Sequence, residues 1–324
     1  MREYTVAVDA PNASQMGYDE GALETWLEVK DVLSSSHAVF IVGAKETNWF
    51  GVSVHPDPVI HYLESRIRDS SEDDPRFQQA STDKLYLTLT VERSGEMDPS
   101  MQFPLVRFLE QFFLACNLAC PGSCGFSTGP IRLDPVLLEV PFHQGRLVSD
   151  DSLDATGDHW PALKPVAFRH AWEWLHEDLS YDVEVAQTPA QLAVFSLLIL
   201  ASRIPEDPDN LLALSRAIEG IFGLGIKTNV TSTLQRRIEH HFGPSPFFPK
   251  WFREFYDLRS RLIHGGTILR PGLSTPQSRE AHAFLDAHLG AIEHGSRVLL
   301  AAVYEMIRSN KRELDIPRTF PDSP

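Results

Sequence analysis

Arg259 and His264 lie five positions apart in the segment DLRSRLIHGG, residues 257–266. On an α-helix this spacing turns the two side chains about 140° apart, so they can flank one groove but do not stack on one face as an i,i+4 pair does. Gly265 and Gly266 follow the histidine directly, and glycine just past the last helical residue is a common helix end. The sequence therefore predicts His264 at the end of a helix.

These two residue types match the needs of phosphodiester cleavage in RNA. An arginine grips a phosphate through parallel hydrogen bonds and offsets negative charge in the transition state. A histidine transfers protons near neutral pH, and the negative end of a helix dipole favours a protonated imidazole. Because RNA supplies its own 2′-hydroxyl as the nucleophile, the chemistry needs neither a metal ion nor a nucleophilic side chain.

The surroundings of the pair are basic, although the chain is acidic overall. The formal net charge of −15 argues against a general nucleic-acid coating protein. Between residues 234 and 272, however, seven Lys or Arg residues stand against three acidic residues, a local excess of four. A local excess of this kind is typical of a site for a polyanion. We therefore expect Lys250, Arg253 and Arg261 to contact RNA.

Two further groups of residues carry side chains that can bind metals. They are Cys116, Cys120 and Cys124 in one segment, and His170, Glu173 and His176 in another. A structural zinc site uses four ligands, and the cysteines contain no C-x-x-C pair, so we interpret them as small buried hydrophobic residues. Helical zinc motifs place a glutamate between two closely spaced histidines. We therefore interpret the second group as the solvent face of a helix, and we expect no metal or other cofactor.

The remaining pattern predicts an α+β protein of two domains. Strands rich in β-branched and aromatic residues are expected at residues 4–10, 38–44, 49–54, 84–92 and 135–142, with a helix at 103–120. Polar stretches at residues 68–83 and 148–165 are expected to be loops or linkers. We expect a mixed α/β domain with a regulatory or sensing role at residues 1–165, followed by an all-α bundle at residues 166–324.

The second half is expected to be helical. Helices are predicted at residues 167–179, 188–203, 208–223, 231–242, 250–264 and 276–309. Thr188, Asp207 and Thr275 each precede a proline, which marks a capped helix start, and STLQ at residues 232–235 has the spacing of a capping box. Short polar connections between the helices favour an antiparallel bundle.

The lengths of the apolar runs and the number of cysteines indicate where in the cell the protein is expected. The most apolar run, residues 191–201, is far shorter than the roughly 20 residues that a membrane span needs, so a buried core helix is expected there. No apolar stretch at the start of the chain has the length of a secretory signal. Three cysteines, an odd number in a chain of 324 residues, do not indicate a disulfide framework. We expect a cytoplasmic protein without a membrane partner.

Three segments of the second half resemble, in order, parts of the HEPN superfamily, and in particular its Apea-like branch. FYDLRSRLIHGG (residues 255–266) resembles the C-terminal signature, in which an Arg-Ser pair leads through a short apolar run to His-Gly at a helix end. LLALSRAIEGIFGLG (residues 211–225) resembles an earlier helix, with Glu219 at its acidic position, and LQRRIEHHFG (residues 234–243) resembles the helix between them. In the first half, FFLACNLACPGSCGF (residues 112–126) is similar to a segment often found upstream of such domains.

The resemblance implies a helical bundle that forms a homodimer and brings Arg–His pairs from two protomers into one groove. It implies a metal-independent RNA endonuclease of defence or stress systems, which acts on single-stranded RNA and leaves a 2′,3′-cyclic phosphate. Arg259 would bind the scissile phosphate, His264 would transfer protons, and Ser260 would orient them. Glu219 is expected to pair with an arginine across the bundle. The alternative is a non-catalytic HEPN module that binds RNA or another partner.

Overall fold

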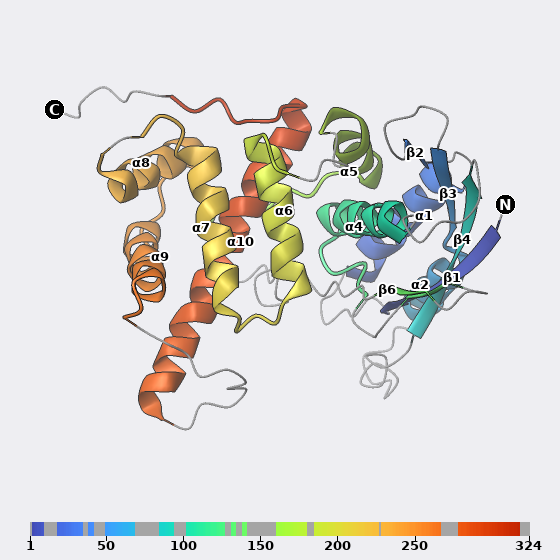
Figure 1. The fold of residues 1–324 in the computed structure, drawn as a ribbon, viewed down its shortest axis with the longest axis horizontal. Coiled ribbons are helices and arrows are strands. Elements are labelled where there is room, and N and C mark those ends of the chain that lie inside the picture. Colours follow the sequence, from blue (N-terminus) through green and yellow to red (C-terminus); the bar gives the residue numbers. More distant parts are fainter. Residues whose placement is uncertain are drawn as a thin grey trace. The chain divides into compact units, whose positions relative to one another are not determined.

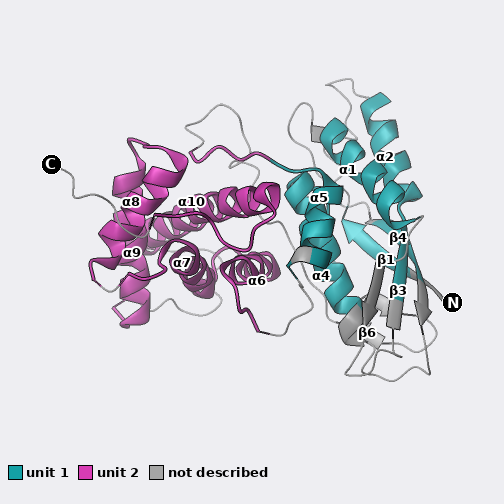
Figure 2. Cartoon of the chain, turned by 90° about the horizontal axis from the view of Figure 1, so that it is seen from above, with its two compact units in different colours: residues 1–147, 165–182 teal, residues 148–164, 183–324 magenta. Residues whose placement is uncertain are grey.

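The computed structural model describes residues 2–9, 18–34, 38–41, 49–68, 84–93, 102–126, 131–133, 138–140, 160–179, 185–226, 228–266 and 278–317. They form an α+β fold, as predicted, in which an antiparallel sheet with helices precedes a mainly helical region (Figure 1). Unit 1 consists of residues 1–147 and 165–182, and unit 2 of residues 148–164 and 183–324 (Figure 2). The expected boundary at residue 165 is thus a point where the chain returns from unit 2 to unit 1. The polar stretches at residues 68–83 and 148–165 lie mostly outside the described residues.

Unit 1 contains a four-stranded antiparallel sheet in the order β1-β4-β3-β2. Its strands are β1 (Arg2–Asp9), β2 (Ala38–Ile41), β3 (Trp49–His55) and β4 (Lys84–Arg93), each at a predicted position. Val6 pairs with Leu87, and Val54 with Leu89, and all four are buried. A separate hairpin consists of β5 (Ile131–Leu133) and β6 (Leu138–Val140), the latter within the strand expected at residues 135–142.

Unit 1 also contains helices, two of which contact the sheet. The helices are α1 (Tyr18–Leu33), α2 (Asp57–Arg68), α4 (Gln102–Ala119) and α5 (Phe168–Glu173), which continues into the π-helical turn η4 (Trp174–Asp178). α1 contacts β3 and α2 contacts β4. The fully buried Trp26 of α1 lies 5.7 Å from the ring of Phe112 on α4, and its indole N–H donates to the carbonyl of Ser123 at 3.1 Å. These contacts join the helices into one core. Neither α1 nor α2 is among the predicted elements.

Unit 2 is a helical bundle arranged around one central helix. Its helices are α6 (Pro189–Ser202), α7 (Pro208–Phe222), α8 (Val230–Phe242), α9 (Phe248–Ile263) and α10 (Arg279–Ser309). α7 contacts each of the other four. At Gly295 of α10, a Cβ atom would lie 3.1 Å from the side chain of Leu214 on α7 and 3.4 Å from Phe255 on α9. The absence of a side chain at this position lets the three helices pack closely.

The apolar run at residues 191–201 forms most of α6. Leu197, Leu198 and Leu200 are buried, which confirms the expected core helix. Among the helices of the described residues, none has both the length and the apolar character that a membrane-spanning segment requires.

Two helices of unit 2 begin at the predicted capping residues. Thr188 Oγ1 accepts a hydrogen bond from the N–H of Gln191 at 3.2 Å and begins α6. The carboxylate of Asp207 accepts one from the N–H of Asp209 at 2.9 Å and begins α7. In both helices a proline takes the first turn, where its missing N–H costs nothing.

At two other helices the capping residue is not one that the sequence predicted. The capping box expected at residues 232–235 is wrong, because α8 already begins at Val230 after Asn229, whose backbone is left-handed with φ of 52°. The hydroxyl of Ser232 instead donates to the carbonyl of Asn229 at 3.1 Å. α10 begins after Ser278, whose side chain accepts from the N–H of Ala281 at 3.1 Å, whereas Thr275 lies outside the described residues.

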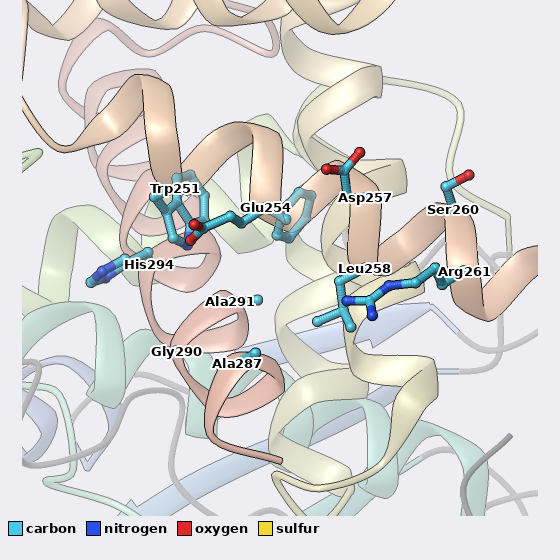
Figure 3. Close-up of a pocket in the computed structure, with 11 residues that line it drawn as sticks. Trp251, Glu254, Asp257, Leu258, Ser260, Arg261, Ala287, Gly290, Ala291 and His294 are labelled. Carbon is cyan, nitrogen blue, oxygen red and sulfur yellow. The ribbon is translucent and has the colours of Figure 1, made fainter. Parts of the chain in front are cut away.

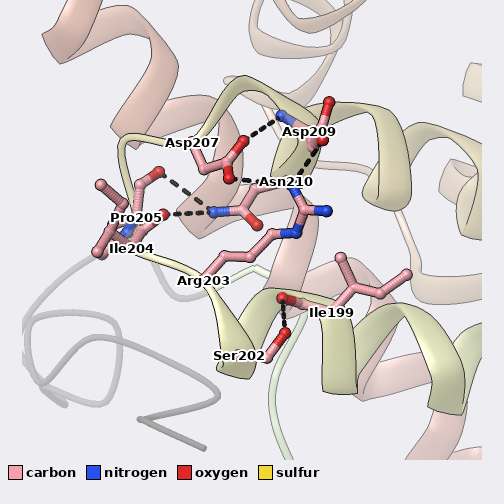
Figure 4. A network of polar contacts seen from close by, with 8 residues as sticks. All are labelled: Ile199, Ser202, Arg203, Ile204, Pro205, Asp207, Asp209 and Asn210. Carbon is pink, nitrogen blue, oxygen red and sulfur yellow. Dashed lines mark hydrogen bonds and ion pairs between the residues drawn. The ribbon is translucent and has the colours of Figure 1, made fainter. Parts of the chain in front are cut away.

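A polar network stabilises the turn between α6 and α7 (Figure 4). One guanidinium nitrogen of Arg203 lies 2.9 Å from Asp207 and 2.6 Å from Asp209. The side-chain amide of Asn210, which is buried, donates to the carbonyl of Ile204 at 2.8 Å. The turn is therefore held by side chains from both of its ends, which sets the position of α7 and of the residues it carries.

Candidate nucleic-acid site on helix α9

The end of α9 presents His264 to solvent. His264 is the C-cap residue of the helix, and its side chain is exposed. Gly265 follows with φ of +70°, a left-handed conformation that glycine adopts without penalty. Its N–H bonds to the carbonyl of Leu262 at 3.4 Å, and the N–H of Gly266 bonds to that of Arg261 at 2.8 Å. This pair of bonds is a Schellman motif, and it places His264 at the helix end, as predicted.

Arg259 lies on the inner side of α9, next to α7. Its Nη2 atom is 3.4 Å from the carboxylate of Glu219, and the two side chains are 30% and 31% exposed. Its guanidinium carbon lies 5.9 Å from the centre of the Tyr256 ring. The Nε atom is shut off from solvent and has no hydrogen-bond partner in the part of the chain that the structure describes. Glu219 therefore pairs with an arginine across the bundle, as expected.

Tyr256 forms the buried side of this ion pair. Its side chain is 8% exposed. Burial raises the pKa of Tyr256, the nearby Glu219 carboxylate raises it further, and Arg259 partly opposes this change. The phenol therefore stays protonated and neutral at physiological pH, so the local charge balance rests on Glu219 and Arg259.

Within one protomer, Arg259 and His264 lie on different sides of the helix end. Their spacing corresponds to about 140° of helix rotation. Arg259 contacts α7, whereas His264 is exposed. No hydrogen bond or ion pair joins these two described residues. The protomer thus positions each group separately, and it does not bring the two side chains together.

A groove of about 710 Å³ lies between α9 and α10 (Figure 3). On α9 it is lined by Trp251, Glu254, Phe255, Asp257, Leu258, Ser260 and Arg261, and on α10 by Ala287, Gly290, Ala291 and His294. Two of the predicted residues, Ser260 and Arg261, are therefore part of its wall. Neither Arg259 nor His264 lines it.

The other two predicted RNA contacts lie on the exposed surface of α9, outside the groove lining. Lys250 is 3.8 Å from the carboxylate of Glu254, four positions along the helix, and both side chains are largely exposed. The Nε–H of Arg253 donates to the carbonyl of Pro249 at 3.2 Å. These side chains are accessible to a polyanion, but the structure does not gather them with Arg259.

The groups with metal-binding side chains have structural surroundings. Cys116 and Cys124 are buried, and burial raises the pKa of Cys120 to about 12, so its thiol stays protonated at neutral pH. His176 stacks on Trp172 with the ring centres 5.7 Å apart. Within the described ranges, no cluster of three or more His, Cys, Asp or Glu side chains is arranged to hold a metal ion.

The groove contains residues that the sequence prediction missed. Ala287, Gly290 and Ala291 recur at helical spacing and form a face of short side chains on α10. Trp251 and Glu254 have the same kind of spacing on α9. This periodicity is visible in the sequence, but which two helices face each other depends on packing between distant segments.

Comparison with known proteins does not assign the site. No family model, no curated protein and no solved structure matches this chain.

Proposed function

We propose that this chain is a metal-independent RNA endonuclease of the HEPN type, of the kind that acts in defence or stress responses. The end of α9 carries the proposal. A Schellman turn presents His264 to solvent, while Glu219 holds the guanidinium of Arg259 earlier on the same helix. The Arg–His motif therefore lies at the end of α9, and Glu219 of α7, at the acidic position named in the resemblance, contacts its arginine.

In the proposed reaction, the 2′-oxygen of the RNA attacks the adjacent phosphorus and the bond from phosphorus to the 5′-oxygen breaks. The products are a 2′,3′-cyclic phosphate and a 5′-hydroxyl. One imidazole removes the proton of the 2′-hydroxyl and a protonated imidazole donates one to the leaving 5′-oxygen. Arg259 binds the non-bridging oxygens and offsets their charge in the transition state.

A homodimer supplies both imidazoles. A single His264 cannot remove and donate a proton in the same step, so the second copy of the chain provides the other histidine. Dimerisation also explains how Arg259 and His264 act together, because within one protomer they lie on different sides of the helix end. Arg259 of one copy and His264 of the other then share one phosphate, with Ser260 as the polar neighbour.

Cleavage of single-stranded RNA in excess chelator tests the proposal. Wild-type protein is expected to release 2′,3′-cyclic phosphate ends, and His264→Ala and Arg259→Ala are each expected to lower the rate by about 10²–10⁴-fold. His282→Ala removes an exposed histidine of α10 and serves as the matched control, with unchanged activity. Wild-type protein that cleaves no faster than His264→Ala overturns the enzyme proposal.

The alternative is a non-catalytic RNA-binding or interaction module. The observation that favours it is the position of Arg259, which contacts Glu219 and Tyr256 rather than His264. This function predicts intact RNA in the cleavage assay. An RNA-binding module then shows a steep loss of affinity with rising salt, whereas a module for a protein partner shows little salt dependence.

A further inference from the structure

The groove between α9 and α10 has room for a nucleotide. Its volume of about 710 Å³ falls in the range of ligand sites in proteins. Phe255 and Leu258 are buried and contribute apolar surface from α9. On α10 the wall includes the short side chains of Ala287 and Ala291, and a Cβ atom at Gly290 would meet no atom of the other described residues within 4 Å, apart from the backbone of its own helix. The groove is therefore an open space with a partly apolar lining.

One end of the groove offers a hydrogen-bond donor next to an acceptor. Trp251 and Glu254 are three positions apart, so they share a face of α9, and both line the groove (Figure 3). The indole nitrogen of Trp251 is shut off from solvent and has no hydrogen-bond acceptor among the described residues, so it is a buried donor without an acceptor. The carboxylate of Glu254 is 65% exposed and can accept two hydrogen bonds from one ligand.

This pairing of groups matches one of the four RNA bases. The Watson–Crick edge of guanine presents the O6 acceptor followed by two donors, N1–H and the N2 amino group. Adenine and cytosine each place an amino donor beside an acceptor nitrogen, and uracil has a single N–H between two carbonyls. A donor followed by a carboxylate therefore complements guanine, and single-stranded RNA exposes this edge for recognition.

The other end of the groove has one arginine, Arg261, with the carboxylate of Asp257 one helical turn before it. Ser260 and Arg261 line it there (Figure 3), and an arginine is well suited to bind a phosphate. Glu254 and Arg261 lie seven residues apart on α9, so their backbone positions are about 10 Å apart along the helix axis. This separation is similar to the distance between the base edge and the phosphate of a nucleotide.

We propose that the groove binds a guanine nucleotide, with the base at Trp251 and Glu254 and the phosphate at Arg261. That this guanine belongs to single-stranded RNA rests on the proposed function, whose RNA substrate the groove would help to select. His264 lies three residues beyond Arg261 at the end of the same helix. The groove accordingly sets a preference for cleavage near guanine.

Binding of free mononucleotides to the full-length chain tests the site without any cleavage. Isothermal titration calorimetry is expected to give tighter binding of GMP than of AMP, CMP or UMP. Glu254→Gln is expected to weaken GMP binding about tenfold, the value of one bidentate contact to a base, and Trp251→Phe, which keeps an aromatic ring without the N–H, weakens it as well. Glu280→Gln removes an exposed carboxylate of α10 that does not line the groove and leaves GMP binding unchanged.

Two further variants separate the parts of the site. Arg261→Ala is expected to weaken binding of GMP but not of guanosine, because guanosine has no phosphate. Gly290→Leu fills the open space of the groove and is expected to abolish GMP binding, while thermal unfolding shows that the variant is folded. Equal binding of the four nucleotides, or no effect of Glu254→Gln, overturns the inference. So does binding of arginine amide in place of GMP, which identifies a site for a cationic side chain.

The two proposals fail separately. RNA cleavage without guanine preference and without GMP binding removes the guanine site and leaves the nuclease. GMP binding that depends on Glu254, in a protein that leaves RNA intact, removes the nuclease and leaves the nucleotide site.

Discussion

The guanidinium of Arg259 on α9 lies 3.4 Å from the carboxylate of Glu219 on α7. The pair joins two helices whose sequences both contribute to the proposed motif. Because Arg259 is proposed to bind a phosphate, the carboxylate acts in two ways: it orients the guanidinium, and it competes with the phosphate for it. The strength of this ion pair therefore determines how readily the arginine becomes available to RNA.

A double-mutant cycle measures that strength. Glu219→Gln, Arg259→Gln and the double variant are expected to show a coupling energy of about 0.5–1 kcal/mol, because the two side chains are partly exposed and water screens their charges. Urea unfolding of the wild type and the three variants at low salt gives the four free energies of unfolding, and the coupling should shrink at high salt. Strictly additive effects of the two substitutions would show that the ion pair contributes nothing.

Arg237 on α8 is expected to be a much stronger contributor to stability. It is 3% exposed, and its Nη1 atom donates to the carbonyl of Phe222 at 2.7 Å and to that of Leu224 at 2.8 Å, at the end of α7. Burial lowers the pKa of Arg237. Arg237→Met is expected to lower the free energy of unfolding by about 2–3 kcal/mol, because buried carbonyls lose bonds to a charged donor.

The neighbouring arginine provides the control for this prediction. Arg236 is exposed, so Arg236→Met is expected to change the free energy of unfolding by no more than about 0.5 kcal/mol. Denaturant unfolding of the two variants gives the comparison. Equal effects of the two substitutions would show that the bonds to the end of α7 are not stabilising.

Local signals in the sequence were sufficient for several elements. Thr188 and Asp207 begin their helices as predicted, since each needs only a capping side chain and a following proline. The glycines after His264 likewise identify the end of α9. The start of α8 was predicted to within one residue, but its capping box was wrong, because Asn229 adopts a left-handed conformation and Ser232 bonds back to it inside the helix. Capping spacing alone does not distinguish these two arrangements.

Other features depend on packing between distant residues. α2 has buried Val59, Ile60 and Leu63 at helical spacing, a signal present in the sequence but short and interrupted by charged residues. The groove on α9 exists because α10 faces it with short side chains such as Gly290. The pairing of Arg259 with Glu219 could be expected from the resemblance, and the angle between Arg259 and His264 from their spacing of five residues. Which side of α9 faces the bundle, with Arg259 toward α7 and His264 exposed, follows from the packing of α7 against α9.

The left-handed glycine at the end of α9 gives a third prediction. Gly265→Ala is expected to lower the free energy of unfolding by about 1 kcal/mol, because a side chain disfavours φ of +70°. Gly266→Ala is the control, since a Cβ atom there would meet its nearest neighbour at 3.6 Å, an ordinary contact. If the proposed function holds, Gly265→Ala also slows RNA cleavage more than Gly266→Ala, because it disturbs the turn that positions His264. A reversed order in urea unfolding would contradict the assigned helix end.

His288 of α10 makes stability depend on pH. It is fully buried, and this burial lowers the pKa of His288 below the ordinary value of 6.5, an effect that the nearby backbone of Asp207 and Pro205 only partly offsets. Between the lowered pKa and 6.5, the unfolded chain binds more protons than the folded protein. The free energy of unfolding therefore falls as the pH drops through this window, and the contribution levels off below the folded-state pKa.

Replacement of His288 by a side chain that cannot bind a proton tests this dependence. His288→Leu is expected to lose less stability than the wild type between about pH 7.5 and about pH 5.5, as measured by urea unfolding at both values. His282→Leu, at an exposed position on the same helix, should keep the wild-type dependence. Leucine at this position binds no proton in the folded or the unfolded chain. If the free energy of unfolding of His288→Leu still falls with pH as steeply as that of the wild type, proton binding by His288 is not the cause of the pH dependence.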